Sequence, residues 1–160
     1  YLEYDPNTFK DKVVLLPCDD PEWSNFTRFF AQNFEMLGLK KLISTSYATN
    51  SKNKSGCVQL SLFDFLTDFE TNSPQYDKDL SPCKGKIFTL TRSSSQKIDI
   101  NDLKWKYLDG DGDFRSDEVT KLRDEADIIV TNPPFSLFRE YIDQLIEFLL
   151  LYIKHATSYL

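Results

Sequence analysis

The segment Asn132-Pro133-Pro134-Phe135 contains the residue types best suited to chemistry in this sequence. Two successive prolines fix φ and hold the preceding residue extended, so the Asn132 side chain and the nearby carbonyl groups point in set directions. The Asn132 side-chain oxygen and the Pro133 carbonyl can then each accept one N–H of a flat amino group, leaving the nitrogen lone pair directed at an electrophilic methyl group. Phe135 offers a face for stacking a base. A strand-ending Asn-Pro turn is the alternative interpretation.

The neighbouring elements favour the chemical interpretation. Residues 127–131 form the clearest apolar strand in the chain, and open α/β sheets place ligands at the carboxyl ends of such strands. A helix is predicted over residues 117–126, and another begins after its N-cap Ser136. Residues 148–153 are expected to form a further strand. The apolar positions of the helix after Ser136 are Phe138, Tyr141, Ile142, Leu145 and Ile146.

A βαβ unit is predicted near the N-terminus. The apolar run in residues 12–16 is typical of a buried parallel strand, and Pro17 ends it. Ser24 is a suitable N-cap for a helix that Gly38 closes, and residues 39–47 form the second strand. A strand, a helix and a strand in this order predict a right-handed crossover. The helix is expected to present one apolar stripe, comprising Phe26, Phe29, Phe30, Phe34 and Leu37.

Between these regions, residues 48–108 are predicted to be an irregular insertion. Apolar residues alternate over 57–65 and cluster over 87–91, and polar stretches with proline and glycine separate them, so an inserted hairpin is expected. Two acidic residues and six basic ones lie between positions 84 and 106. This charge is sufficient to face a phosphate backbone, and an ordinary solvated strand face is equally expected. The basic residues are Lys84, Lys86, Arg92, Lys97, Lys104 and Lys106.

Composition limits the classes of protein to be considered. With 160 residues, of which 41% are hydrophobic, the chain is long enough for one packed domain. It has no apolar run long enough to cross a membrane. Three widely spaced cysteines and a single histidine make a zinc site improbable and fit a reduced, cytoplasmic setting. The net charge of −6 does not by itself favour nucleic acid as a partner.

An acidic segment before the helix at 117–126 has a second interpretation. Asp109, Asp111 and Asp113 occupy the first, third and fifth positions of a calcium-binding loop. Phe114 stands where that loop needs glycine, and Thr120 stands where it needs glutamate. A cofactor-binding turn is therefore favoured over a calcium site, and no metal is expected.

Several stretches together resemble a known family. Asn132 to Phe135 match the Asp/Asn/Ser-Pro-Pro-Tyr/Phe/Trp signature of amino methyltransferases that act on adenine N6 or cytosine N4. Residues 112–116 and 126–136, with the early stretches 17–21 and 24–26, resemble the EcoRI-type adenine-specific DNA methyltransferases. The resemblance implies a Rossmann-like α/β fold, S-adenosylmethionine (AdoMet) as cofactor, and double-stranded DNA of a restriction-modification system as substrate, with the target base flipped out.

The resemblance also assigns site residues. Asn132, Pro133, Pro134 and Phe135 would hold the target adenine. The loop after the first strand would hold the methionine moiety of AdoMet, and the following helix N-terminus would meet its carboxylate. The second strand ends in Thr45-Ser46-Tyr47, without the acid that usually binds the ribose, so hydroxyl groups would make that contact. The cofactor residues implied are Pro17, Cys18, Asp19, Asp20, Asn25, Asp113 and Phe114.

Two alternatives stay open from the sequence. An RNA base or a protein glutamine also presents a planar amine or amide to such a pocket. The chain also looks truncated, because the last strands and the DNA-recognition region of the family are expected to be absent from residues 1–160. An inactive AdoMet-binding fragment is therefore the second alternative, and a partner chain would cover the exposed sheet edge.

Overall fold

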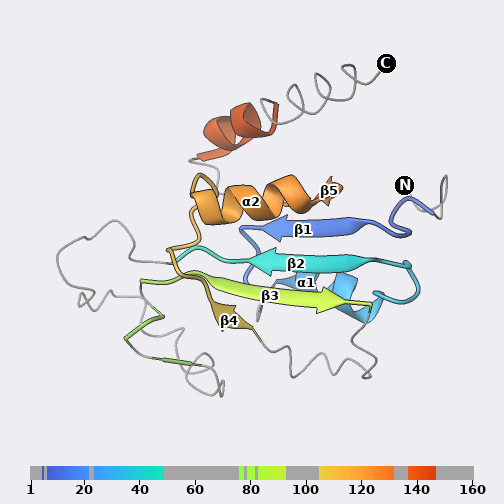
Figure 1. Cartoon of the computed structure of the whole chain (residues 1–160), viewed down its shortest axis with the longest axis horizontal. Helices are drawn as coiled ribbons and strands as arrows, with labels where there is room; N and C mark the ends of the chain where they lie inside the picture. Colours follow the sequence, from blue (N-terminus) through green and yellow to red (C-terminus); the bar gives the residue numbers. More distant parts are fainter. Residues whose placement is uncertain are drawn as a thin grey trace.

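The computed structural model describes residues 5, 7–21, 24–48, 76–77, 79–81, 83–92, 105–131 and 137–146. These residues form a mixed five-stranded sheet in the order β4-β3-β2-β1-β5 (Figure 1). Residues 137–146 are also helical. The elements are β1 (Val13–Pro17), α1 (Asn25–Gln32), β2 (Lys41–Thr45), β3 (Lys86–Thr91), β4 (Lys106–Tyr107), α2 (Asp117–Glu125) and β5 (Ile128–Ile129).

Strand β1 lies between two parallel neighbours. It pairs with β2 along its whole length, from Val13 opposite Lys41 to Pro17 opposite Thr45. On its other edge it pairs with β5, where Val14 is opposite Ile128. Strand β3 runs antiparallel to β2 and continues the sheet to β4. The carboxyl ends of β1 and β2 and the start of β3 therefore meet at one side of the sheet (Figure 1).

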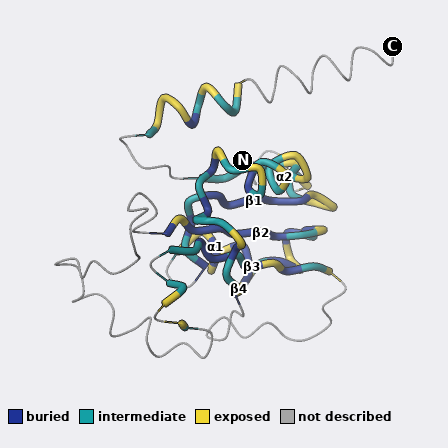
Figure 2. The backbone as a smooth tube through the Cα atoms, turned by 60° about the vertical axis from the view of Figure 1, so that its left-hand side comes forward, coloured by how far each residue is buried: buried dark blue, intermediate teal, exposed yellow. Residues whose placement is uncertain are grey.

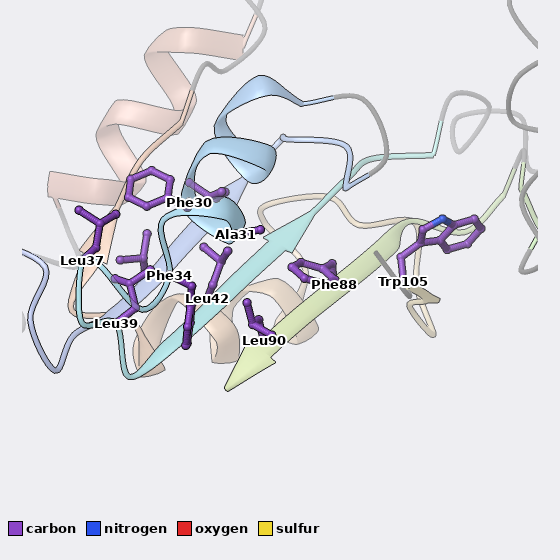
Figure 3. Packing of buried hydrophobic residues seen from close by; sticks show 11 residues of the cluster. Phe30, Ala31, Phe34, Leu37, Leu39, Leu42, Phe88, Leu90 and Trp105 are labelled. Carbon is purple, nitrogen blue, oxygen red and sulfur yellow. The ribbon is translucent and has the colours of Figure 1, made fainter. Parts of the chain in front are cut away.

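Successive residues of β1 contribute to two cores on opposite faces of the sheet. Val14 and Leu16 pack in a cluster with the α1 residues Phe30 and Ala31, together with residues of the turn after α1 and of the neighbouring strands (Figure 3). On the other face, Leu15 packs in a cluster that includes Leu122 of α2. All five residues of β1 are buried, as Figure 2 shows for this strand. This burial confirms the buried parallel strand predicted from the apolar run.

Helix α1 differs from the prediction in length and rotation. It begins after the predicted N-cap Ser24 but ends at Gln32, and turns follow up to Gly38, whose φ is 66°. The continuous apolar stripe is wrong, because Phe26 and Phe29 are each 44% exposed. The buried hydroxyl of Thr27 bonds to the Ser44 hydroxyl at 2.7 Å. This bond turns Thr27 toward the sheet, and the two phenylalanines point away from it.

The remaining predicted elements have mixed outcomes. The helix at 117–126 and the strands at 39–47 and 127–131 are confirmed in shorter form, and the cluster at 87–91 is strand β3, which joins the main sheet. The strands predicted at 57–65 and 148–153 lie outside the described residues. Cys83 is disulfide-bonded, which departs from the reduced cysteines expected. No helix among the described residues is long and apolar enough to cross a membrane.

A close contact of three backbone segments fixes the loop before α2. Gly112 has a φ of 77°, and a Cβ at this position would overlap the Ser46 carbonyl oxygen at the end of β2. A Cβ on Gly85 would lie 2.5 Å from the same oxygen. Hydrogen bonds hold the segments together, including one of 2.7 Å from Ala48 N to the carbonyl oxygen of Asp111. Only glycine fits at this crossing, which carries the loop across the carboxyl end of the sheet.

Gly112→Ala is therefore expected to destabilise the chain by about 2–4 kcal/mol, since it combines left-handed strain with a backbone overlap. Gly110→Ala is the matched control, because a Cβ there would meet only the Glu118 carboxylate at 3.4 Å. We expect the control to change stability by about 1 kcal/mol or less. Urea unfolding measures both values. Equal effects of the two substitutions would contradict the role given to the crossing.

Candidate active site

The predicted cofactor residues lie at the carboxyl end of the sheet, on the side where β1 separates β2 from β5. The chain leaves β1 on one face toward α1 and β2, and it returns through α2 to β5 on the other side of β1. Open α/β sheets bind ligands where the strand order diverges in this way. The Thr131 hydroxyl donates a 2.7 Å hydrogen bond to the Pro17 carbonyl oxygen, so the ends of these two strand regions are in contact.

The predicted catalytic segment cannot be placed in this geometry. Asn132, Pro133, Pro134 and Phe135 lie outside the described residues. The residues that flank them are described: β5 leads to Thr131, and the helix of residues 137–146 follows. Thr131 bonds to the Pro17 carbonyl oxygen at the exit of β1, and the helix of residues 137–146 contacts Phe114 through the ring of Tyr141. The segment is therefore bounded by residues of the candidate site on either side.

Cys18 makes the sharp turn at the exit of β1. Its φ is 65°, a left-handed value that is uncommon for a residue with a side chain. Burial raises the pKa of the Cys18 thiol to about 11, and the nearby charges of Asp19 and Asp113 act in the same direction. The thiol is consequently protonated at neutral pH. It acts as a small neutral group in the wall of the site and is unsuited to nucleophilic attack.

The buried carboxylate of Asp19 has a hydrogen-bond partner at only one of its two oxygens among the described residues. Its side chain is 7% exposed, and its Oδ1 accepts a 2.8 Å hydrogen bond from the Ser24 hydroxyl. Its buried Oδ2 has no hydrogen-bond partner among the described residues. The same Ser24 oxygen accepts from Phe26 N and Thr27 N as the cap of α1. An unmatched carboxylate oxygen beside a helix N-terminus is a site for a cationic donor.

Asp20, unlike Asp19, forms an ion pair with a buried lysine. The Lys86 ammonium, whose side chain is 5% exposed, lies 3.3 Å from Asp20 Oδ2. The same ammonium lies 4.8 Å from the centre of the Trp105 ring. A buried cation thus already compensates Asp20, which leaves Asp19 as the better partner for a ligand ammonium. Sequence reasoning missed this pair, because Lys86 reads as an ordinary basic residue of a strand.

Lys86 and Arg92, two residues of the predicted basic run, lie at opposite ends of β3. Lys86 is buried against Asp20 at the start of β3. Arg92 lies beyond the other end of β3, where it bonds to Asp11 and to the Gly38 carbonyl oxygen. Lys97 and Lys104 lie outside the described residues. Strand β3 therefore separates Lys86 from Arg92, whereas Lys106 on β4 pairs with Ile87, next to Lys86.

Asp113 and Phe114 follow the glycine crossing and lie near β1. Both carboxylate oxygens of Asp113 accept from Arg115, at 2.9 Å from Nε and 2.6 Å from the second terminal nitrogen. Arg115 also bonds to Glu140 at 3.0 Å, which connects the loop to the helix of residues 137–146. Phe114 is 7% exposed, and its ring centre lies 5.0 Å from that of Tyr141 in an edge-on arrangement. Contacts with Arg115 and Tyr141 therefore hold the side chains of Asp113 and Phe114 in place.

The remaining residues predicted to contact the cofactor are Asn25 and the hydroxyl-bearing residues at the end of β2. Asn25, the first residue of α1, is exposed. Thr45 and Ser46 are buried, and the Ser46 hydroxyl accepts from Lys86 N at 3.2 Å, whereas Tyr47 is 38% exposed. Among the described residues, no three acidic, cysteine or histidine side chains gather to hold a metal ion. Of the hydroxyl groups proposed for a ribose contact, Tyr47 is the one with substantial exposure.

The sequence as a whole is similar to known proteins. The family model "Adenine-specific methyltransferase EcoRI" matches residues 1–156. The chain is 40% identical over 147 residues to Type II methyltransferase M.EcoRI of Escherichia coli, covering 92% of this chain and 38% of that protein. It is 35% identical over 158 residues to M.MpnI of Mycoplasma pneumoniae, covering 96% and 37%. The chain thus spans less than two fifths of these curated relatives. No solved structure matches it.

The state of Asp19 gives a pH-dependent prediction. Burial raises the pKa of this carboxyl, and the Ser24 hydrogen bond only partly opposes the rise. Ionisation therefore costs stability at a pH above the folded-state pKa, and this cost disappears below the unfolded-state value of about 3.9. Asp19→Asn cannot ionise. We expect it to have a higher Tm than the parent at pH 7, and we expect the difference to shrink as the pH falls toward 4.

Thermal unfolding followed by circular dichroism at both pH values tests this expectation. Asp79→Asn is the matched control, because Asp79 is exposed. A surface change of this kind is expected to stay within about 0.5 kcal/mol of the parent at either pH. A Tm difference for Asp19→Asn that does not change with pH would show that ionisation of Asp19 is not its cause.

Proposed function

The chain belongs to the family of EcoRI-type adenine-specific methyltransferases, and from this membership we propose that it forms the AdoMet-binding, methyl-transferring core of a DNA adenine-N6 methyltransferase of a restriction-modification system. The observation that carries the proposal is the unmatched buried oxygen of Asp19, located where the central strand ends. It supplies the acceptor that the ammonium of the AdoMet methionine moiety requires. The sequence after the adjacent strand β5 is the amino-methyltransferase signature, Asn132 to Phe135.

A Rossmann-like arrangement is part of this proposal. The three parallel strands β2, β1 and β5 have helices packed on both faces, and the chain leaves β1 through α1 to β2 and returns from β4 through α2 to β5 on the other edge of β1. These features support a nucleotide-type cofactor site at the exit of β1. The antiparallel strands β3 and β4 extend the same sheet. Lys86, the first residue of β3, contacts Asp20 of the cofactor loop.

The cofactor site is proposed to run along the end of the sheet. AdoMet, when bound, supplies an electrophilic methyl group on its sulfonium centre. Asp19 would hold the ammonium, and the N-terminus of α1, with Asn25, would meet the carboxylate. Pro17 and Cys18 would line the turn between them, and Asp20 would stabilise that turn through Lys86. A bound cation at Asp19 would satisfy the carboxylate oxygen that is otherwise unmatched.

The adenine of the cofactor is proposed to lie against the loop before α2. Asp113 would accept a hydrogen bond from its amino group, and Phe114 would pack on the ring. Arg115 already holds both carboxylate oxygens of Asp113, so the carboxylate is oriented, and the amino group would share it. The edge-on contact of Phe114 with Tyr141 keeps the phenylalanine ring in place. Preorganisation of this kind reduces the ordering cost of binding.

The target adenine is proposed to be flipped from double-stranded DNA into the segment that follows β5. Asn132 and the Pro133 carbonyl would accept the two N–H groups of the amine, Pro134 would fix the backbone, and Phe135 would stack on the base. The lone pair would then face the methyl group, and positioning would supply most of the rate enhancement. Such an enzyme would work in the cytoplasm, and a further strand or a partner chain would cover the outer edge of β5.

Methyl transfer to DNA tests the proposed chemistry. We expect Asn132→Ala to lower the rate of methyl transfer to unmethylated plasmid DNA by on the order of a hundredfold, as the loss of one positioned acceptor commonly does. Asn7→Ala is the control, because Asn7 is an exposed residue near the N-terminus. Tritiated AdoMet gives the readout. Activity that survives Asn132→Ala would show that the amine acceptor is assigned incorrectly.

Calorimetry separates this proposal from its alternatives. The chain is expected to bind AdoMet, and Asp19→Asn is expected to weaken binding by about tenfold or more, because a charge-assisted contact is lost. No binding at millimolar AdoMet would overturn the proposal for this chain. Binding without transfer to DNA would favour an inactive cofactor-binding fragment. Transfer to RNA or to protein glutamine, with none to DNA, would replace the proposed substrate.

A further inference from the structure

Two buried hydroxyl groups lie between α1 and the end of β2, and the proposed function gives neither of them a role. They belong to Thr27 and Ser44, whose side chains are each 0% exposed. Their oxygens lie 2.7 Å apart. Polar groups removed from water in this way are stable only where they form hydrogen bonds, so the direction of their contacts indicates what they hold in place.

The two hydroxyl groups form a directed path to Asp19. The Ser44 hydroxyl donates a 2.7 Å hydrogen bond to the backbone carbonyl oxygen of Asp19. A hydroxyl group carries one proton, and that of Ser44 is used in this bond. Thr27 must therefore donate to the Ser44 oxygen in the contact between them. Two hydrogen bonds thus run from α1 through β2 to the residue that is proposed to hold the AdoMet ammonium.

Asp19 is also held at its other backbone group and at one carboxylate oxygen. Its N–H donates to the carbonyl oxygen of Thr45, the residue after Ser44 in β2, at 2.9 Å. Its Oδ1 accepts from the Ser24 hydroxyl at 2.8 Å. The residue before it, Cys18, makes the left-handed turn. These contacts fix the position of Oδ2, the buried oxygen of Asp19 that has no partner among the described residues.

We propose that Ser44 and Thr27 are positioning residues that fix the direction of the Asp19 carboxylate for the ammonium group of AdoMet. Ser44 acts on Asp19 through the backbone carbonyl oxygen, and Thr27 acts through Ser44. A preset acceptor lowers the ordering cost of binding, because the ligand does not have to establish its geometry. The inference rests on the proposed function, because it places the AdoMet ammonium at Asp19.

AdoMet binding by the full chain, measured by calorimetry, tests the two residues. Ser44→Ala removes the donor to Asp19, and we expect it to raise the Kd of AdoMet about fivefold, the effect of one hydrogen bond. Thr27→Val removes the donor to Ser44 and is expected to raise the Kd about two- to fivefold. The double variant is expected to resemble Ser44→Ala alone, since both substitutions break one path. Thr27→Ser, which keeps the hydroxyl, is expected to bind like the parent.

A mutant cycle with Asp19→Asn shows whether Ser44 acts through Asp19. Asp19→Asn removes the charge that Ser44 is proposed to position, so adding Ser44→Ala to it should change the Kd by less than about twofold. A general distortion of the cofactor loop would instead keep its full effect of about fivefold in this background. Circular dichroism and the urea midpoint of each variant show whether it is folded.

Thr8→Val is the matched control for Thr27→Val. The Thr8 hydroxyl donates to the Asp5 carbonyl oxygen at 2.7 Å, ahead of β1, whereas the cofactor loop follows the other end of this strand. Its loss should leave the Kd of AdoMet unchanged. A rise in Kd as large as that of Thr27→Val would overturn the inference, because the loss of any hydroxyl hydrogen bond would then weaken binding.

The outcomes distinguish this inference from the function on which it rests. If the parent chain does not bind AdoMet, the proposed function fails for this chain and the inference fails with it. If the parent binds and Ser44→Ala binds equally well, the inference alone is wrong. It is also wrong if Ser44→Ala keeps its full effect in the Asp19→Asn background. Should Ser44→Ala not fold, equal Kd values for Thr27→Val and Thr27→Ser would contradict the inference.

Discussion

The burial of β1 is the constraint on which the rest of the structure depends. Its five residues are inaccessible, and its backbone is bonded on both edges to parallel strands. Alternate side chains enter two cores, so helices must cover both faces. The chain leaves β1 through α1 to β2 on one edge and returns through α2 to β5 on the other edge. The exit of β1 is consequently a place where polar groups gather without a strand or helix to cover them.

Polar groups at that exit are arranged at a cost to stability. Asp19 keeps a buried oxygen without a partner among the described residues, and Cys18 adopts a left-handed backbone conformation. Folding alone would not select either feature, and each is the kind of strain that proteins retain at functional sites. Neighbouring groups limit the cost: Lys86 compensates Asp20, and Ser24 links Asp19 to the cap of α1. These contacts hold the residues around the site in place, while Asp19 Oδ2 has no hydrogen-bond partner among the described residues.

Local sequence determined the main elements of the fold. The apolar run of β1, the N-cap Ser24 and the glycine at position 38 each act within a few residues, so their effects can be read along the chain. The motif at Asn132 indicates the family through its residue types alone, and the family comparison confirms it. The roles of Asn132 to Phe135 stay predictions, because these residues lie outside the part of the chain that the structure describes.

Tertiary structure decided what local pattern cannot encode. The rotation of α1 depends on the Thr27–Ser44 bond, and the burial of Lys86 depends on Asp20, 66 positions earlier in the chain. The Thr131 hydroxyl bonds to the carbonyl oxygen of Pro17, 114 positions earlier in the chain. Only when β1 and β5 lie side by side does the Thr131 hydroxyl reach Pro17, because such contacts depend on strand order and not on spacing.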